Sequence, residues 1–196
     1  MNLSHSATRD VSARFASLKS TKLYDFTQDP CHKCVLSGIP SSFKVTRDTI
    51  ADLRMSGCTI AMDFLSVTSY DVAYIMGMHF RAGEWGQKPR CGSVITCVMD
   101  GQSLYARVHK FLHVEGDDCP GYAFVSWFSE PRYWFPDNEL VVVVGLDDGG
   151  KLSDIYGNVI RITQIDPSQV MVEDDSRMEG YFMMRDSGYD TRRSEE

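Results

Sequence analysis

The chain has 196 residues, of which 43% are hydrophobic and 24% are charged, and its formal net charge is −7 at neutral pH. Its length and composition are those of a globular protein with one domain or two small ones. Nucleic-acid binding depends on Lys and Arg side chains that neutralise phosphates, so the acidic balance argues against a nucleic acid and favours a basic protein partner.

The start of the chain and its cysteines predict an intracellular protein. Residues 1–14 are polar and contain no apolar central run, so we expect no signal peptide. The six cysteines are then most simply interpreted as reduced thiols.

Residues 1–90 are predicted to form a small α/β region. Thr46 can cap a helix over Arg47–Ser56, and Gly57 can end it. A strand is expected over Thr59–Val67, while residues 31–43 are expected to be irregular. The glycine-rich stretch of residues 81–92 is the best candidate for a linker.

Residues 91–185 are predicted to form a β domain. A strand over Val94–Met99 leads through a tight turn at Asp100-Gly101 into a second strand over Leu104–Val114. In that second strand polar and apolar residues alternate, which is the period of a strand with one face on a core. The alternation places Tyr105 and Phe111 on the outer face.

The remaining elements of this domain are short and rich in β-branched and aromatic residues. They are expected at Tyr122–Phe128, Leu140–Val144, Val159–Ile165, Val170–Glu173 and Tyr181–Arg185, with a long polar connection over Gly145–Gly157. Such spacing predicts a mainly β fold, either a small antiparallel barrel or a rolled sheet. Residues 186–196 are expected to be a disordered acidic tail.

Three short motifs in this domain resemble a known family. The strand Tyr105–Phe111 is followed by Val125-Ser126-Trp127-Phe128 with Pro131 three residues on, and then by Asn138-Glu139-Leu140. In this order they resemble the bromo-adjacent homology (BAH) domain, over roughly Gly92 to Asp174. The resemblance implies a chromatin-associated interaction module in the nucleus, and some members bind methyl-lysine through aromatic residues near such positions.

Two other interpretations come from different classes of protein. The same stretch, with Ile162–Pro167 and Tyr181–Arg185, also resembles a carboxy-terminal segment of some eukaryotic DNA-transposon proteins. That resemblance implies a domesticated or fragmentary mobile-element protein that acts on DNA within a larger assembly. The third interpretation is an enzyme with a dispersed active site, which predicts a polar pocket joining His109 or His113 to a carboxylate. No short catalytic motif supports it, so we predict a protein that is not an enzyme.

The candidate binding residues are aromatic. Aromatic rings attract cations over their faces, and cages of them bind methylated lysine. The residues predicted to form the binding surface for a basic peptide or histone tail are Trp134, Tyr133, Trp127, Tyr105 and Phe135. The alternative for Trp127 is a place in the core, because indole side chains are usually well buried.

Metal binding has one weak candidate. Cys31-x-x-Cys34 has the spacing of two zinc ligands, but no second pair follows it, so two ordinary thiols are favoured and no cofactor is predicted. His109 and His113 would lie about 13 Å apart on a strand, too far for one ion. They are interpreted as surface residues.

Overall fold

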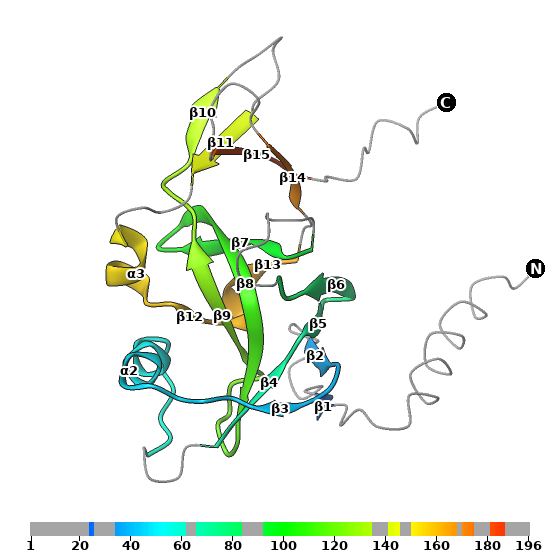
Figure 1. The fold of residues 1–196 in the computed structure, drawn as a ribbon, viewed down its shortest axis with the longest axis vertical. Helices are drawn as coiled ribbons and strands as arrows, with labels where there is room; N and C mark the ends of the chain where they lie inside the picture. Colours follow the sequence, from blue (N-terminus) through cyan, green and yellow to red (C-terminus); the bar gives the residue numbers. More distant parts are fainter. Residues whose placement is uncertain are drawn as a thin grey trace, which may run out of the picture.

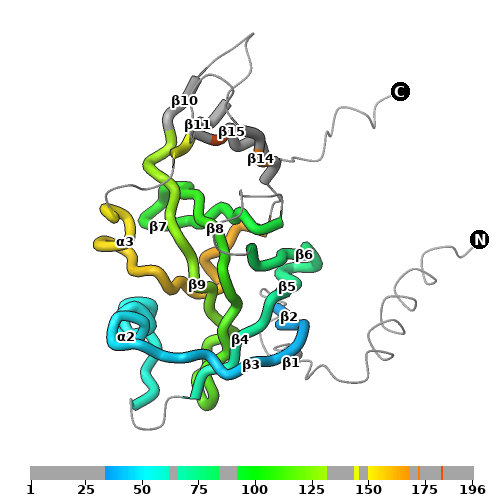
Figure 2. Tube along the Cα trace, in the orientation of Figure 1, coloured from blue at the N-terminus to red at the C-terminus, as the bar shows by residue number. Residues whose placement is uncertain are grey.

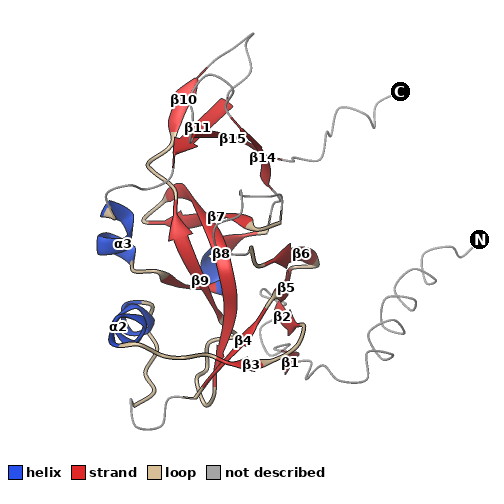
Figure 3. Cartoon of the chain, in the orientation of Figure 1, coloured by secondary structure: helices blue, strands red, loops and turns tan. Residues whose placement is uncertain are grey.

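The protein is mainly β, with antiparallel sheets (Figure 3). The computed structural model describes residues 24–25, 34–61, 66–83, 92–134, 141–145, 150–167, 170–174 and 181–186. The predicted tail after residue 186 and residues 1–23 lie outside this part of the chain. No helix in the described part is both long and apolar enough to cross a membrane.

The elements follow one another in a mostly β order. The strands are β1 (Tyr24–Asp25), β2 (Cys34–Ser37), β3 (Ser41–Ser42), β4 (Val67–Tyr70), β5 (Val72–Ile75), β6 (Met78–Arg81), β7 (Val94–Met99), β8 (Gln102–Val114), β9 (Tyr122–Trp127), β10 (Arg132–Trp134), β11 (Val141–Gly145), β12 (Val159–Arg161), β13 (Ile165–Asp166), β14 (Val170–Asp174) and β15 (Tyr181–Asp186). The helices are α2 (Arg47–Met55), α3 (Lys151–Tyr156) and the 3₁₀ turn η2 (Ile162–Gln164).

Strand β8 is the centre of the largest sheet. One of its edges pairs with β7 in its first half and with β4 in its second half, while the other edge pairs with β9. In the view of Figure 1, α2 and α3 lie on one side of β8 and β9, and β1, β2, β5 and β6 lie on the other. The tube in Figure 2 shows the same division.

The central sheet rolls back toward its starting strand. β12 pairs with β9, the chain then turns through η2, and β13 pairs with β7. A single bent segment, residues 159–166, therefore borders both ends of the β7–β8–β9 meander. No pairing joins β12 to β13 in the described part of the chain, so the sheet is rolled and is not a closed barrel. The sequence expectation of one strand over Val159–Ile165 missed the interruption at η2.

A β-bulge at His109 changes which residues of β8 face the main core. Val108 pairs with Val125 and Lys110 pairs with Phe124, so His109 is an extra residue on β8. Before the bulge the even-numbered residues face the main core, but after it Phe111 does. The prediction that Tyr105 and Phe111 share an exposed outer face is wrong: Phe111 is buried in the main core, and Tyr105, on the opposite face of β8, is buried in a second cluster.

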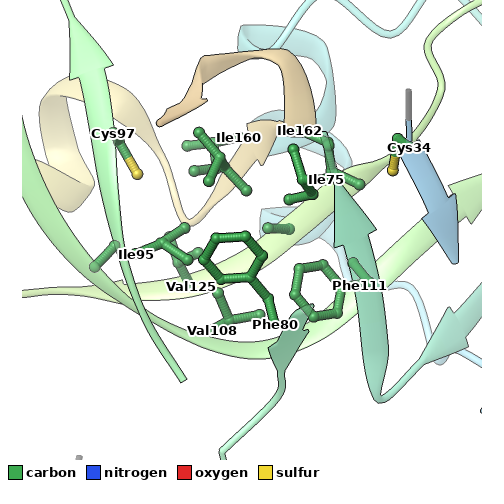
Figure 4. Packing of buried hydrophobic residues seen from close by; sticks show 14 of the residues in the cluster. Cys34, Ile75, Phe80, Ile95, Cys97, Val108, Phe111, Val125, Ile160 and Ile162 are labelled. Carbon is green, nitrogen blue, oxygen red and sulfur yellow. The ribbon is translucent and has the colours of Figure 1, made fainter. Parts of the chain in front are cut away.

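The main core takes residues from both sides of the predicted division at residues 90 and 91. Leu36, Tyr70 and Phe80 pack in one cluster with residues of β7, β8, β9 and η2. Figure 4 shows Phe80 and Phe111 facing Ile160 and Ile162. Residues 1–90 thus supply strands to the same core as residues 91–185.

Local sequence signals explain one helix and miss the other. Thr46 caps α2 as predicted, with its Oγ1 accepting a hydrogen bond from the Thr49 backbone N–H at 3.2 Å, and Gly57 follows the helix with φ 81°. The stretch Gly145–Gly157, expected to be a long polar connection with no helix or strand assigned to it, contains α3. Two other expectations are wrong: residues 31–43 include β2 and β3, and regular strand structure in the described part of Thr59–Val67 begins only at Val67.

Candidate functional site

Trp127, one of the predicted binding residues, is a core side chain. It is 3% exposed, and its Nε1–H donates a hydrogen bond to the Gly157 carbonyl at 2.7 Å. Its indole also lies 5.9 Å from the ring of Tyr156, measured between centroids. These contacts join β9 to the carboxyl-terminal end of α3, so Trp127 does not offer a ring to a ligand at the surface of this structure.

Tyr105 is also buried, in a cluster that joins two sheets. It packs with Val94 and Phe128 of the central sheet region and with Val144 and Phe182 of the sheet formed by β10, β11, β15 and β14. The rings of Phe128 and Phe182 meet edge to face at 5.9 Å. Tyr105 therefore holds the smaller sheet against β8.

Tyr133 and Trp134 lie on β10, one of the two outer strands of that smaller sheet. Tyr133 pairs with Val142 and Trp134 pairs with Val141. The strand order is β10-β11-β15-β14, and no other described strand pairs with the second edge of β10. Figure 1 shows this sheet at the end of the molecule opposite α2 and β3. Phe135 lies outside the described residues.

A cluster of polar side chains is buried between β8, β9 and Gly83. Arg107 and His109 of β8 are 8% and 4% exposed. His109 Nε2 lies 2.7 Å from Ser126 Oγ, and the Gly83 backbone N–H donates to the Val108 carbonyl at 2.8 Å. A Cβ at Gly83 would lie 3.0 Å from Arg107 Nε and 3.1 Å from Ser93 Cβ, so a larger residue there would have to displace these side chains slightly. The expectation of a surface His109 is wrong.

The environment of His109 makes it a weak base. Burial, together with the positive charge of Arg107, lowers the pKa of His109 from 6.5 to about 4. A serine next to a histidine is the elementary unit of a hydrolytic nucleophile, but a general base works best with a pKa near the operating pH. The pair His109–Ser126 is thus suited to holding β8 and β9 in register.

Of the two cysteines predicted as possible zinc ligands, Cys34 lies among the described residues. Cys34 is 2% exposed, and burial, with a smaller contribution from Cys119, raises its pKa to about 12. Zinc binds the thiolate form, which this environment disfavours. Cys31 lies outside the described residues. In the described part of the chain, no three His, Cys, Asp or Glu side chains are grouped closely enough to hold a metal ion.

The structure also contains a small apolar cavity that the sequence did not predict. Its volume is about 180 Å³. The described residues that line it are Cys34, Ile75, Met76, Pro120, Ile162, Thr163, Ile165 and Pro167. They come from β2, the β5–β6 turn, the loop before β9, and the segment η2–β13. Figure 4 shows Cys34, Ile75 and Ile162 at one end of the main core. No local pattern connects four such separate segments.

Comparison with known proteins brings no match: no protein-family model, no curated protein and no solved structure matches this chain.

Proposed function

We propose that the protein is a non-enzymatic interaction module with a BAH-like β domain, which docks on a basic, histone-like protein segment in a nuclear setting. The observation that carries this proposal is the position of β10. It is an outer strand of its sheet, and it carries Tyr133 and Trp134 at the end of the molecule.

An outer strand of this kind can bind a peptide in a simple way. Its second row of backbone N–H and C=O groups can pair with an extended segment of a partner, while neighbouring side chains select the partner's residues. Tryptophan and tyrosine rings add an attraction for Lys, Arg or methylated lysine of about 0.5–2 kcal/mol each.

The charge of the chain selects the same class of partner. The protein has 27 acidic and 20 basic residues. An acidic surface accelerates the approach of a cationic segment and disfavours an anionic one. A Lys-rich tail is cationic, so it would be attracted to such a surface.

The BAH-like assignment is supported by the place of its motif in the fold. Trp127 ends β9, Phe128 follows it, and the two side chains enter two different clusters, one on each side of the sheet. β9 is also the strand that β12 joins before the chain returns to β7. The motif therefore lies where the strands of the rolled sheet meet. Residues at such a position stabilise the fold, so a fold of the BAH type would require them.

The test is a titration of the whole chain with a Lys-rich peptide, its trimethyl-lysine form and a matched peptide with Lys replaced by Gln. We expect quenching of tryptophan fluorescence by the basic peptides and a two- to thirtyfold loss of affinity in Trp134→Ala, from the energy of one lost ring. Trp134→Phe should retain part of the affinity because it keeps an aromatic face. Equal affinity of Trp134→Ala and the unchanged protein, or binding to duplex DNA in place of every basic peptide, would overturn the proposal.

A further inference from the structure

The apolar cavity described above has the size of one side chain. Small-molecule sites usually have volumes of about 300–1,000 Å³, whereas a cavity of about 150 Å³ holds a benzene-sized group. At about 180 Å³, the cavity beside η2 is too small for most cofactors and large enough for a leucine or methionine side chain. Its lining is apolar except for Thr163 and Cys34, which favours a hydrocarbon occupant.

Met76 at the edge of the cavity has an unusual backbone conformation. Met76 and Gly77 form the two-residue turn between β5 and β6, and both have positive φ, 51° and 84°. Turns of this kind prefer Asn-Gly or Asp-Gly, and the chain uses Asp100-Gly101 in the corresponding turn between β7 and β8. A methionine in the left-handed region is unfavourable, so the turn itself does not explain its presence.

Met76 is also exposed. The residue is 55% exposed, although it is large and apolar, and it lines the cavity. Flexible methionine side chains are common on surfaces that bind apolar groups of a partner, because they adapt to different shapes. Strain and exposure at one residue together indicate a contact that is made only when a partner is present.

The charges on two of the lining segments are mostly negative. The loop 115–121 carries Glu115, Asp117 and Asp118, of which Asp117 accepts a hydrogen bond from the Tyr122 hydroxyl, and the segment 161–167 carries Asp166. Arg161 is the one basic residue of these two segments, and its Nε and Nη2 donate to the Ser56 and Gly57 carbonyls at the end of α2. A partner with positive charge on either side of its apolar residue fits this arrangement.

We propose that the cavity between the β5–β6 turn and η2 binds a single leucine or methionine side chain of a partner segment with basic residues on both sides. Met76 closes over the inserted side chain. The site shares no residue with β10, so it can be tested separately from the proposed role of Tyr133 and Trp134. It adds a second point of contact, selective for an apolar residue, to the recognition of a basic segment.

The experiment compares two peptides on the whole chain: a lysine-rich nonapeptide with one central leucine, and the same peptide with serine at that position. Binding is followed by isothermal titration and by the NMR signals of the Met and Ile methyl groups. We expect the leucine peptide to bind about tenfold more tightly, the worth of one well-placed apolar contact, and to shift the signals of Met76, Ile162 and Ile165.

Met76→Asn separates binding from folding. Asparagine suits the turn better than methionine does, so the temperature of unfolding should rise, while the preference for the leucine peptide should be lost. Met55→Asn is the matched control, since Met55 is 54% exposed on α2 and does not line the cavity. It should keep the preference.

Each outcome decides between the two sites. Equal affinity for the leucine and serine peptides, or an unchanged preference in Met76→Asn, overturns the cavity proposal even if Trp134→Ala weakens binding. A leucine preference lost in Met76→Asn supports it, even if Trp134→Ala has no effect and the role of β10 fails. Methyl shifts confined to residues outside the cavity also overturn it, because the leucine then binds elsewhere.

Discussion

Replacing Trp127 by Phe tests whether the tryptophan of the BAH-like motif is a core residue. The substitution removes the donor to the Gly157 carbonyl, an interaction of 2.7 Å in a side chain that is 3% exposed. A buried polar group that loses its partner costs about 1–3 kcal/mol. The smaller ring leaves unfilled space in the core, which adds about 1–2 kcal/mol. We therefore expect the free energy of unfolding to fall by about 3 kcal/mol.

The assay for Trp127→Phe is urea unfolding followed by far-UV circular dichroism, which does not depend on the tryptophan signal. The dependence of the free energy on urea should be unchanged, so that the loss appears as a lower midpoint. Ile155→Ala is the control, because Ile155 is 58% exposed and should change stability by no more than about 0.5 kcal/mol. A loss of less than about 0.5 kcal/mol in Trp127→Phe would refute the core role and return Trp127 to the candidates for ligand binding.

Two further predictions concern the polar group on β8 and the turn after α3. Because burial lowers the pKa of His109 from 6.5 to about 4, the unfolded chain binds more protons in this interval, and stability should fall on the order of 3 kcal/mol as the pH drops from 6.5 to 4. His109→Gln should flatten that dependence in urea unfolding at successive pH values; an equally steep dependence would mean that His109 titrates normally. Gly157→Ala should destabilise the protein by more than 2 kcal/mol, roughly, because Gly157 has φ 70° and ψ −179° and a Cβ there would lie 2.8 Å from Asp52 Oδ1. Gly150→Ala has a positive φ but open space around the Cβ, so thermal unfolding should show a smaller loss of about 1 kcal/mol, and equal losses at both glycines would contradict the steric argument.

Elements with local signals were predictable from the sequence. The cap at Thr46, the Asp100-Gly101 turn and the β-rich runs 94–99 and 122–127 each depend on neighbouring residues, and each is present. Helix α3 was missed because it has six residues and begins after Gly150, which offers no side-chain cap. A helix this short has little intrinsic stability and depends on packing that the sequence does not display.

The faces of β8 show why the binding residues were harder to predict. Alternation assumes an uninterrupted strand, and the extra residue at His109 reverses the faces halfway along β8. It also assumes one exposed face, whereas Tyr105 is covered by residues of the smaller sheet. The cavity could not be predicted at all, since its walls meet only after the sheet has rolled.

The pairing of β4 with β8 has a consequence for the evolution of this protein. β4 completes the edge of β8 where β7 ends, so residues 67–70 and 111–114 form one ladder across the predicted division. A gene rearrangement that separated the two halves would leave a hydrogen-bonding edge and an apolar surface bare on each fragment, and such edges promote aggregation. Selection should therefore act against genes that separate the two halves, and the two halves should be inherited as one unit.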